Sequence, residues 1–295
     1  MPIKNYLQGT QFPIPVILDT SVVRHFLHED EEVGYLDVGK LKSAAVPLKL
    51  SISWVASAEL MDDLMTRAIP FDLWARRVPE LDSVIDRSLP VFPGGRHLGA
   101  LLWIPGTGAF SEDDRLGYRV LWRLMSRARQ KLDLIDGITY HDSKGKPRMI
   151  ANRKGALQQG IEKQRQWWRG SFGIFEAVAS QHQAEVKDVS DSIRSFDGKT
   201  DRKLDVIREL YAQFLDLKQK GMEPSGEKRR GDVFDFQLVL PLALPAVVLC
   251  DDEKLVNRCR QLPSPRWKLL MTVKEFHKRL VGQTLVPLLL EFRSR

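Results

Sequence analysis

The pattern of apolar and polar positions predicts α/β structure at the N-terminal end of the chain. Residues 14–19 form a short apolar run that ends in Asp-Thr-Ser and is typical of a buried strand followed by a helix through Phe26. Residues 48–53 alternate apolar and polar positions, which predicts a second strand. Residues 54–67 then place apolar side chains at helical spacing, so a helix is expected there.

The C-terminal end shows the same rhythm. A helix from Asp232 is expected first, and the pattern then predicts strands over 246–250 and 267–272 with a helix around 252–260 between them. Together the two ends predict a three-layer α/β/α sandwich with a mainly parallel sheet.

The middle of the chain differs from both ends. Prolines and glycines between residues 70 and 108 predict loops and short elements. Further along, apolar spacing predicts three helices, over 115–131, 172–196 and 201–220. The sequence therefore predicts three parts: residues 1–94 and 230–295, which together form the α/β domain, and a large helical, basic insertion over 95–229.

Composition narrows the class of protein. The chain has 295 residues, a net charge of +7 and only two cysteines, Cys250 and Cys259. This cysteine content predicts neither a disulfide framework nor a zinc site, and it fits a reducing compartment. The longest uncharged apolar run, residues 238–250, holds two prolines and is too short to span a bilayer, which takes about 20 residues. We therefore expect a cytoplasmic protein that is not embedded in a membrane, with a polyanion as its partner.

Acidic residues stand at the ends of the predicted strands and on two predicted helices. Asp19 ends the first strand, and Asp251 and Asp252 follow the strand over 246–250. Glu59 lies on the helix over 54–67, and the segment Asp232-Val233-Phe234-Asp235 places two more carboxylates one helical turn apart. Carboxylates at the ends of buried strands are costly to desolvate unless they bind cations or hydrogen-bond donors. Their order along the chain predicts a divalent-metal site and a hydrolase that acts on phosphodiesters.

These motifs resemble the PIN domain family of metal-dependent nucleases over roughly residues 14–67 and 230–280. The family has an Asp after its first strand, a Glu on an early helix, one or two aspartates on a later helix and a Thr-x-Asp motif after the next strand. In this chain, Cys250 occupies the position of the Thr in the family's Thr-x-Asp motif. The resemblance implies a catalytic metal site whose ligands are Asp19, Glu59, Asp232, Asp235 and Asp252.

The resemblance also implies the cofactor. Mg²⁺ or Mn²⁺ is expected, because both ions prefer oxygen ligands and keep open positions for water and substrate. Whether one or two ions bind, and whether Asp251 or Asp252 is the ligand, stays open. Taken singly, Asp19 and Asp232 also suit helix N-termini, Asp251 and Asp252 suit a turn, and Glu59 suits a solvated helix face.

Basic and aromatic residues in the middle of the chain are candidates for binding nucleic acid. Residues 143–170 carry eight Lys or Arg against one Glu. Phosphate contacts hold a strand without reading its sequence, and a tryptophan can stack on an unpaired base. An alternative is that the arginines line a solvated helix face and the tryptophans belong to the core. The candidates are Arg115, Arg119, Arg123, Arg127, Arg165, Trp167, Trp168, Arg229 and Arg230.

The predicted function is a metal-dependent endonuclease that acts on RNA rather than DNA, since many PIN proteins, including toxins of toxin–antitoxin pairs, cleave RNA. Such a toxin implies a neutralising protein partner, and a homo-oligomer is also open. Two alternatives remain: a catalytically inactive PIN-like protein that binds nucleic acid, and a DNA nuclease of the 5′-nuclease type. Of the six histidines, only His25 and His28 are spaced as metal ligands could be, and these two are expected to pack or to face solvent.

Overall fold

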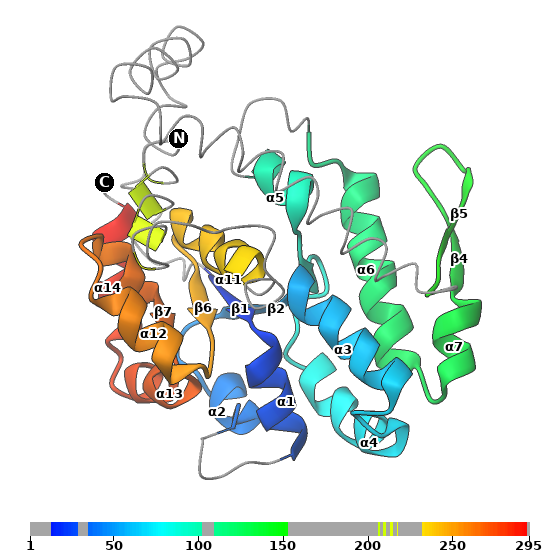
Figure 1. The fold of residues 1–295 in the computed structure, drawn as a ribbon, viewed down its shortest axis with the longest axis horizontal. Coiled ribbons are helices and arrows are strands. Elements are labelled where there is room, and N and C mark those ends of the chain that lie inside the picture. Colours follow the sequence, from blue (N-terminus) through cyan, green and yellow to red (C-terminus); the bar gives the residue numbers. More distant parts are fainter. Residues whose placement is uncertain are drawn as a thin grey trace, which may run out of the picture.

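A five-stranded parallel sheet forms the centre of the molecule (Figure 1). The computed structural model describes residues 13–28, 35–101, 109–152 and 232–293, with six single positions between 206 and 217. The strands of this sheet, in spatial order, are β3 (Val91–Phe92), β2 (Leu48–Ser53), β1 (Ile14–Leu18), β6 (Val247–Leu249) and β7 (Leu270–Met271).

The order of the strands creates a reversal between β1 and β6. From β1 the chain moves outward to β2 and β3, and it later returns beside β1 at β6 before moving outward the other way to β7. Because parallel crossovers are right-handed, the two directions place their helices against opposite faces of the sheet. In open sheets of this kind the carboxyl ends of the two strands at the reversal flank a crevice that commonly binds ligands.

Helices account for most of the remaining described chain. They are α1 (Thr20–His28), α2 (Val38–Lys42), α3 (Trp54–Thr66), α4 (Phe71–Asp82), α5 (Gly95–Leu101), α6 (Glu112–Arg127), α7 (Lys131–Asp136), α11 (Asp232–Val239), α12 (Glu253–Arg260), α13 (Val273–Val281) and α14 (Leu285–Arg293). There are also two 3₁₀ helices: η4 (Leu240–Ala243) precedes β6, and η5 (Pro265–Leu269) precedes β7. A separate antiparallel hairpin is formed by β4 (Ile138–His141) and β5 (Pro147–Ile150).

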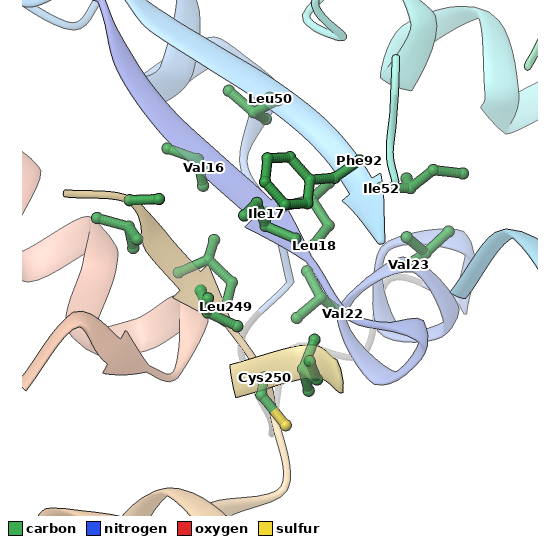
Figure 2. Packing of buried hydrophobic residues seen from close by; sticks show 14 of the residues in the cluster. Val16, Ile17, Leu18, Val22, Val23, Leu50, Ile52, Phe92, Leu249 and Cys250 are labelled. Atoms are coloured by element: carbon green, nitrogen blue, oxygen red, sulfur yellow. The ribbon is translucent and has the colours of Figure 1, made fainter. Parts of the chain in front are cut away.

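The core lies around β1, whose apolar side chains point to both faces of the sheet. Val16, Leu18 and Leu249 are fully buried, and Figure 2 shows them packed among residues of β2 and α1. A strand that is covered on both faces is apolar at nearly every position, which explains the unbroken run over 14–18. The strands are thereby fixed in register, and their carboxyl ends lie at one edge.

Several sequence predictions are confirmed. The strand over 48–53 has the predicted bounds, and the strands predicted over 14–19 and 246–250 are β1 and β6. The helix predicted over 54–67 is α3, where the Ser53 hydroxyl accepts a hydrogen bond from the Ala56 N–H (3.0 Å) and so caps the first turn. The α/β class and the parallel sheet therefore agree with the sequence pattern.

Other predictions are wrong in detail. Residues 71–82, expected to be loops or short elements, form the twelve-residue helix α4 although Pro79 lies inside it. Its buried residues Trp74, Val78 and Leu81 recur at helical spacing, and this packing outweighs the loss of one backbone hydrogen bond. The strand predicted over 267–272 is mostly η5, with only β7 in the sheet. The helix predicted over 172–196 lies outside the described residues, and that over 201–220 is described at only a few positions.

Helix α6, from the predicted insertion, packs on the same core as the sheet. The Trp74 indole donates a hydrogen bond to the Met125 carbonyl (2.8 Å), and the Trp122 indole donates one to the Asp82 carboxylate (2.6 Å). Met125 is fully buried in the hydrophobic cluster that contains β1. The predicted boundaries of the three parts stay predictions, but α6 belongs to the core of the α/β domain. Among the described helices, none combines the length and apolar character needed to cross a membrane.

Candidate functional site at the reversal of the sheet

The carboxyl ends of β1 and β6 bring the first and last acidic motifs together. Asp19 directly follows β1, and its N–H donates a hydrogen bond to the carbonyl of Leu249, the last residue of β6 (3.0 Å). One Asp19 oxygen, Oδ2, accepts hydrogen bonds from the Ser21 hydroxyl (2.9 Å) and from the Cys250 thiol (3.4 Å). The half-buried Asp19 carboxylate is therefore held at the point where the strand order reverses.

Cys250 takes over part of the role expected of a hydroxyl at its position. Burial, and next the negative charge of Asp19, raise the pKa of the Cys250 thiol. The thiol therefore stays protonated and acts as a donor to Asp19. Figure 2 shows Cys250 beyond Leu249, at the carboxyl end of β6.

Glu59 is the second carboxylate at this edge. It lies in the second turn of α3, which packs against α1, and its Oε2 atom accepts a hydrogen bond from the Thr20 hydroxyl. Burial raises the pKa of Glu59, the Thr20 hydrogen bond opposes this shift, and the negative charge of Asp19 adds to it. Because Thr20 directly follows Asp19 in the chain, its hydrogen bond to Glu59 brings these two predicted site residues close together.

An arginine lies beside this pair. Arg24, on α1, makes a two-pronged ion pair with Asp63, one turn after Glu59 on α3 (2.8 and 3.1 Å). The hydrogen bond to Asp63 is the main cause that raises the pKa of Arg24, and the charges of Glu59 and Asp19 contribute. Arg24 is therefore committed to Asp63 and supplies only a more distant positive charge to the other two carboxylates.

Asp251 is a structural residue in this arrangement. It is buried, with Oδ1 accepting a hydrogen bond from the Val273 N–H (3.0 Å) and Oδ2 lying 3.1 Å from His25 Nδ1. Its own N–H donates to the Ser21 hydroxyl (3.1 Å). Burial raises the pKa of Asp251, while the Val273 and His25 contacts oppose the shift. Both oxygens of Asp251 are thus used to join β6, α1 and α13.

Asp252 is exposed and caps α12. Its Oδ1 accepts a hydrogen bond from the Leu255 N–H (3.0 Å), as expected for an N-cap aspartate. Its other oxygen has no partner within the described part of the chain. Of the two neighbouring aspartates, Asp252 is therefore the one with a carboxylate oxygen available for a ligand.

The third acidic motif lies on α11, which contacts α3. Asp235 is half-buried on this helix. Asp232 begins the helix, but its side chain lies outside the described residues. The structure therefore places the helix of the third motif next to the helix of Glu59.

A complete metal site is not visible in what the structure describes. Among these residues, no three His, Cys, Asp or Glu side chains converge in a way that could hold an ion. The donor chemistry of Asp19 and Glu59 nevertheless suits Mg²⁺ or Mn²⁺, since both are oxygen ligands and their mutual repulsion is of the kind that a bound cation relieves. The remaining predicted ligands are Asp232, Asp235 and Asp252.

Four of the arginines predicted to bind nucleic acid lie on α6, in two different environments. The Arg115 guanidinium stacks over the Phe110 ring, 4.8 Å from its centre, and Arg119 pairs with Glu112 (2.8 Å). Arg123 and Arg127 are exposed and make no ion pair with any other described residue. The remaining nucleic-acid candidates, Arg165, Trp167, Trp168, Arg229 and Arg230, lie outside the described residues.

Three residues of the site were not predicted. Thr20 and Ser21 were expected only to start a helix, yet their hydroxyls bind Glu59, Asp19 and the Asp251 backbone. His25 was expected to pack or face solvent, yet it contacts Asp251. The spacing of Ser21 and His25, four residues apart on one helix face, was the available signal, but their partner lies 230 and 226 positions away.

Comparisons with known proteins identify no relative. No family model, no curated protein and no solved structure matches the chain. The function must therefore be argued from the site.

Proposed function

We propose that the chain is a divalent-metal-dependent endonuclease of PIN-like type, with its active site at the reversal between β1 and β6. The observation that carries the proposal is the close approach of two half-buried carboxylates: Glu59 accepts a hydrogen bond from Thr20, the residue that directly follows Asp19 in the chain. The negative charge of Asp19 contributes to the raised pKa of Glu59. In proteins, two neighbouring carboxylates of this kind often belong to a site that binds a cation or transfers a proton.

The residues would divide the work as follows. Asp19, Glu59 and the free oxygen of Asp252 would hold Mg²⁺ or Mn²⁺, with Asp232 and Asp235 as the further expected ligands. A bound ion of this kind lowers the pKa of a water and neutralises charge that develops on the scissile phosphate. Ser21, Thr20 and Cys250 would orient the carboxylates through the hydrogen bonds that they donate.

RNA is proposed as the substrate in preference to DNA, by analogy with the family that the motifs resemble. The same analogy makes a neutralising protein partner and a homo-oligomer part of the proposal, together with a cytoplasmic location.

A cleavage assay tests the proposed activity. Labelled RNA and DNA are incubated with the full chain in Mg²⁺, in Mn²⁺ and in chelator. We expect cleavage that requires the metal, is lost in Asp19→Asn and persists in Asp136→Asn, a matched change of an exposed aspartate at the end of α7. Removal of a metal ligand should lower the rate by roughly 100-fold or more. Cleavage by Asp19→Asn at the wild-type rate contradicts the proposal.

A non-catalytic nucleic-acid-binding protein is the second candidate. It is favoured by the use of both Asp251 oxygens in structural contacts and of one Asp252 oxygen in a helix cap. Under this alternative the protein binds RNA or DNA in the same assay, and no substrate is cleaved in either metal. Preferential cleavage of branched or 5′-ended duplex DNA would instead indicate a nuclease of the 5′-nuclease type.

A further inference from the structure

The β4–β5 hairpin has a tip whose shape is fixed by one buried carboxylate. Asp142 Oδ1 accepts hydrogen bonds from the Lys144 N–H (3.0 Å) and the Lys146 N–H (2.9 Å). Its Oδ2 atom accepts one from Arg148 Nε (3.1 Å). Gly145 supplies the positive φ of 73° that this turn requires. The backbone of the tip is thus satisfied internally, and the lysine side chains are left in solvent.

The hairpin is also anchored to α6 at its tip and to α7 at its base. At the tip, the Ser143 N–H and hydroxyl both donate hydrogen bonds to the Asp113 carboxylate (2.7 and 2.8 Å). At the base, the buried Asn152 donates its N–H to the Leu134 carbonyl (2.7 Å). Both strands contact α6, and Figure 1 shows the hairpin beside this helix. The hairpin is therefore held at both ends rather than joined by a single hinge.

The hairpin, α6 and α7 together form a unit, residues 109–152, whose net charge is positive. Residues 109–152 carry nine Lys or Arg and six Asp or Glu. Three of the acids nearest the hairpin already have partners: Asp142 binds the turn, Asp113 binds Ser143, and Glu112 pairs with Arg119. Lys144 and Lys146 are exposed and form no ion pair with another described residue.

Two exposed arginines of α6, Arg123 and Arg127, form no ion pair with another described residue. Ser143 and the Tyr140 hydroxyl lie on the side of α6 that carries Asp113 and Gly117. Helical geometry of 100° per residue places Arg127 about 40° and Arg123 about 80° around the helix from Asp113, on the side away from Gly117. The tip lies beside the first turn of α6, and Arg123 and Arg127 lie in its last turns. Exposed positive side chains therefore lie at the hairpin tip and in the last turns of α6.

We propose that this unit, through Lys144, Lys146, Arg123 and Arg127, binds the phosphodiester backbone of a nucleic acid. Lysine ammonium groups act on phosphates as point charges, so the contacts should be strong in low salt and independent of sequence. The choice of nucleic acid as the polyanion rests on the proposed function. The hairpin would hold the strand while the carboxylates at the sheet edge act on it.

Binding is measured with full-chain Asp19→Asn in chelator, so that cleavage plays no part. Fluorescence anisotropy with labelled mixed-sequence RNA and DNA is recorded over a series of salt concentrations. Replacing two phosphate contacts by Lys144→Gln and Lys146→Gln should reduce the slope of log affinity against log salt by about 1.4–1.8. If both proteins bind equally at 1 M salt, this reduction in slope corresponds to a loss of roughly 15- to 30-fold in affinity at physiological salt.

Two control proteins separate this effect from general ones. Lys144→Arg with Lys146→Arg keeps the charges and should bind like the parent. Lys268→Gln with Lys274→Gln removes two exposed charges at the other end of the molecule and should change the slope little. Circular dichroism confirms that each protein is folded.

The outcomes are decisive for the hairpin. An unchanged salt slope in the Lys→Gln pair, or no binding by the parent protein, overturns the inference. Loss of binding to phosphatidylserine vesicles without any effect on nucleic acid would assign the surface to a membrane instead and also overturns it. If the slope falls as expected while the wild-type protein cleaves nothing in metal, the proposed function fails and the hairpin inference stands.

Discussion

At the scale of single residues, the site is organised by short donors on α1. Thr20 and Ser21 follow Asp19 in the sequence, and each hydroxyl binds a different carboxylate. Ser21 also receives the Asp251 N–H, so a single hydroxyl joins the ends of β1 and β6. These contacts hold the carboxylates of Asp19 and Glu59 close together despite their like charges. The repulsion should lower the free energy of unfolding by a measurable amount.

Replacing Glu59 by glutamine tests this cost. The folded-state pKa of Glu59 is raised above its ordinary value of 4.5, so over the window between the two values the folded protein keeps a proton that the unfolded chain releases. The free energy of unfolding should therefore fall as pH rises through that window. In Glu59→Gln this part of the pH dependence should vanish, because the amide carries no charge and still accepts the Thr20 hydrogen bond.

The measurement is chemical denaturation in chelator at acidic and neutral pH. We expect Glu59→Gln to equal wild type at acidic pH and to exceed it at neutral pH. Comparing the two proteins removes the contribution of Asp251, whose raised pKa acts in the same direction in both. A variant that is less stable than wild type at neutral pH would show that Glu59 is stabilised by a partner rather than strained by its neighbours.

At the scale of elements, the sequence was informative where burial dictates the pattern. The apolar run over 14–18 follows from a strand covered on both faces, and this strand was predicted correctly. The strand over 48–53 was also predicted correctly, although its alternation does not reflect burial, because Ser51 and Ser53 are buried as well. The hairpin was missed because its strands are largely exposed and read as polar, basic chain. Helix α4 was missed because its prolines suggested loops, although Trp74 and Leu81 give it a buried face.

The glycines of the hairpin provide a matched test of its anchoring. Gly137 and Gly145 both have φ of 73°, but a Cβ on Gly137 would lie 2.2 Å from the Ile150 carbonyl oxygen, whereas nothing lies within 4 Å of one on Gly145. Gly145→Ala should therefore cost about 1–2 kcal/mol, the price of a left-handed conformation. Gly137→Ala adds a backbone clash and should cost about 2–5 kcal/mol in total.

Denaturation curves and hydrogen exchange of the β4 and β5 amides report these two costs. The larger loss of protection should occur in Gly137→Ala. Equal effects of the two substitutions would mean that the base of the hairpin is not packed as described.

At the scale of the whole molecule, the site depends on the reversal between β1 and β6, which joins residues more than 200 positions apart. The sequence predicted a mainly parallel sheet and acidic residues at the ends of its strands, but not the strand order. Asp19 and Glu59 lie close together, whereas the division of roles between Asp251 and Asp252 and the part of His25 depend on tertiary contacts. A sequence pattern with a period of two or 3.6 residues carries no information about such contacts.

Core substitutions test whether α6 and the sheet unfold together. Leu18 in β1 and Met125 in α6 are both fully buried in one cluster, so Leu18→Ala and Met125→Ala should each cost about 2–5 kcal/mol and lower the midpoint of the same transition. Leu132→Ala, at a side chain that is 57% exposed, should change stability by about 0.5 kcal/mol or less.

Calorimetry distinguishes unfolding of α6 together with the sheet from unfolding of α6 in a separate transition. If Met125→Ala shifts a separate transition and leaves that of Leu18→Ala in place, α6 belongs to an independent unit and the predicted boundary at residue 95 is supported.

The central claim is that the carboxylates at the β1–β6 edge bind a divalent cation, and Mn²⁺ binding measured by electron paramagnetic resonance tests it most directly. Titration of Mn²⁺ into the full chain should show bound ion in wild type and in Asp136→Asn, with affinity reduced by at least about tenfold in Asp19→Asn and in Glu59→Gln. Equal Mn²⁺ affinity in wild type and Asp19→Asn would contradict the account.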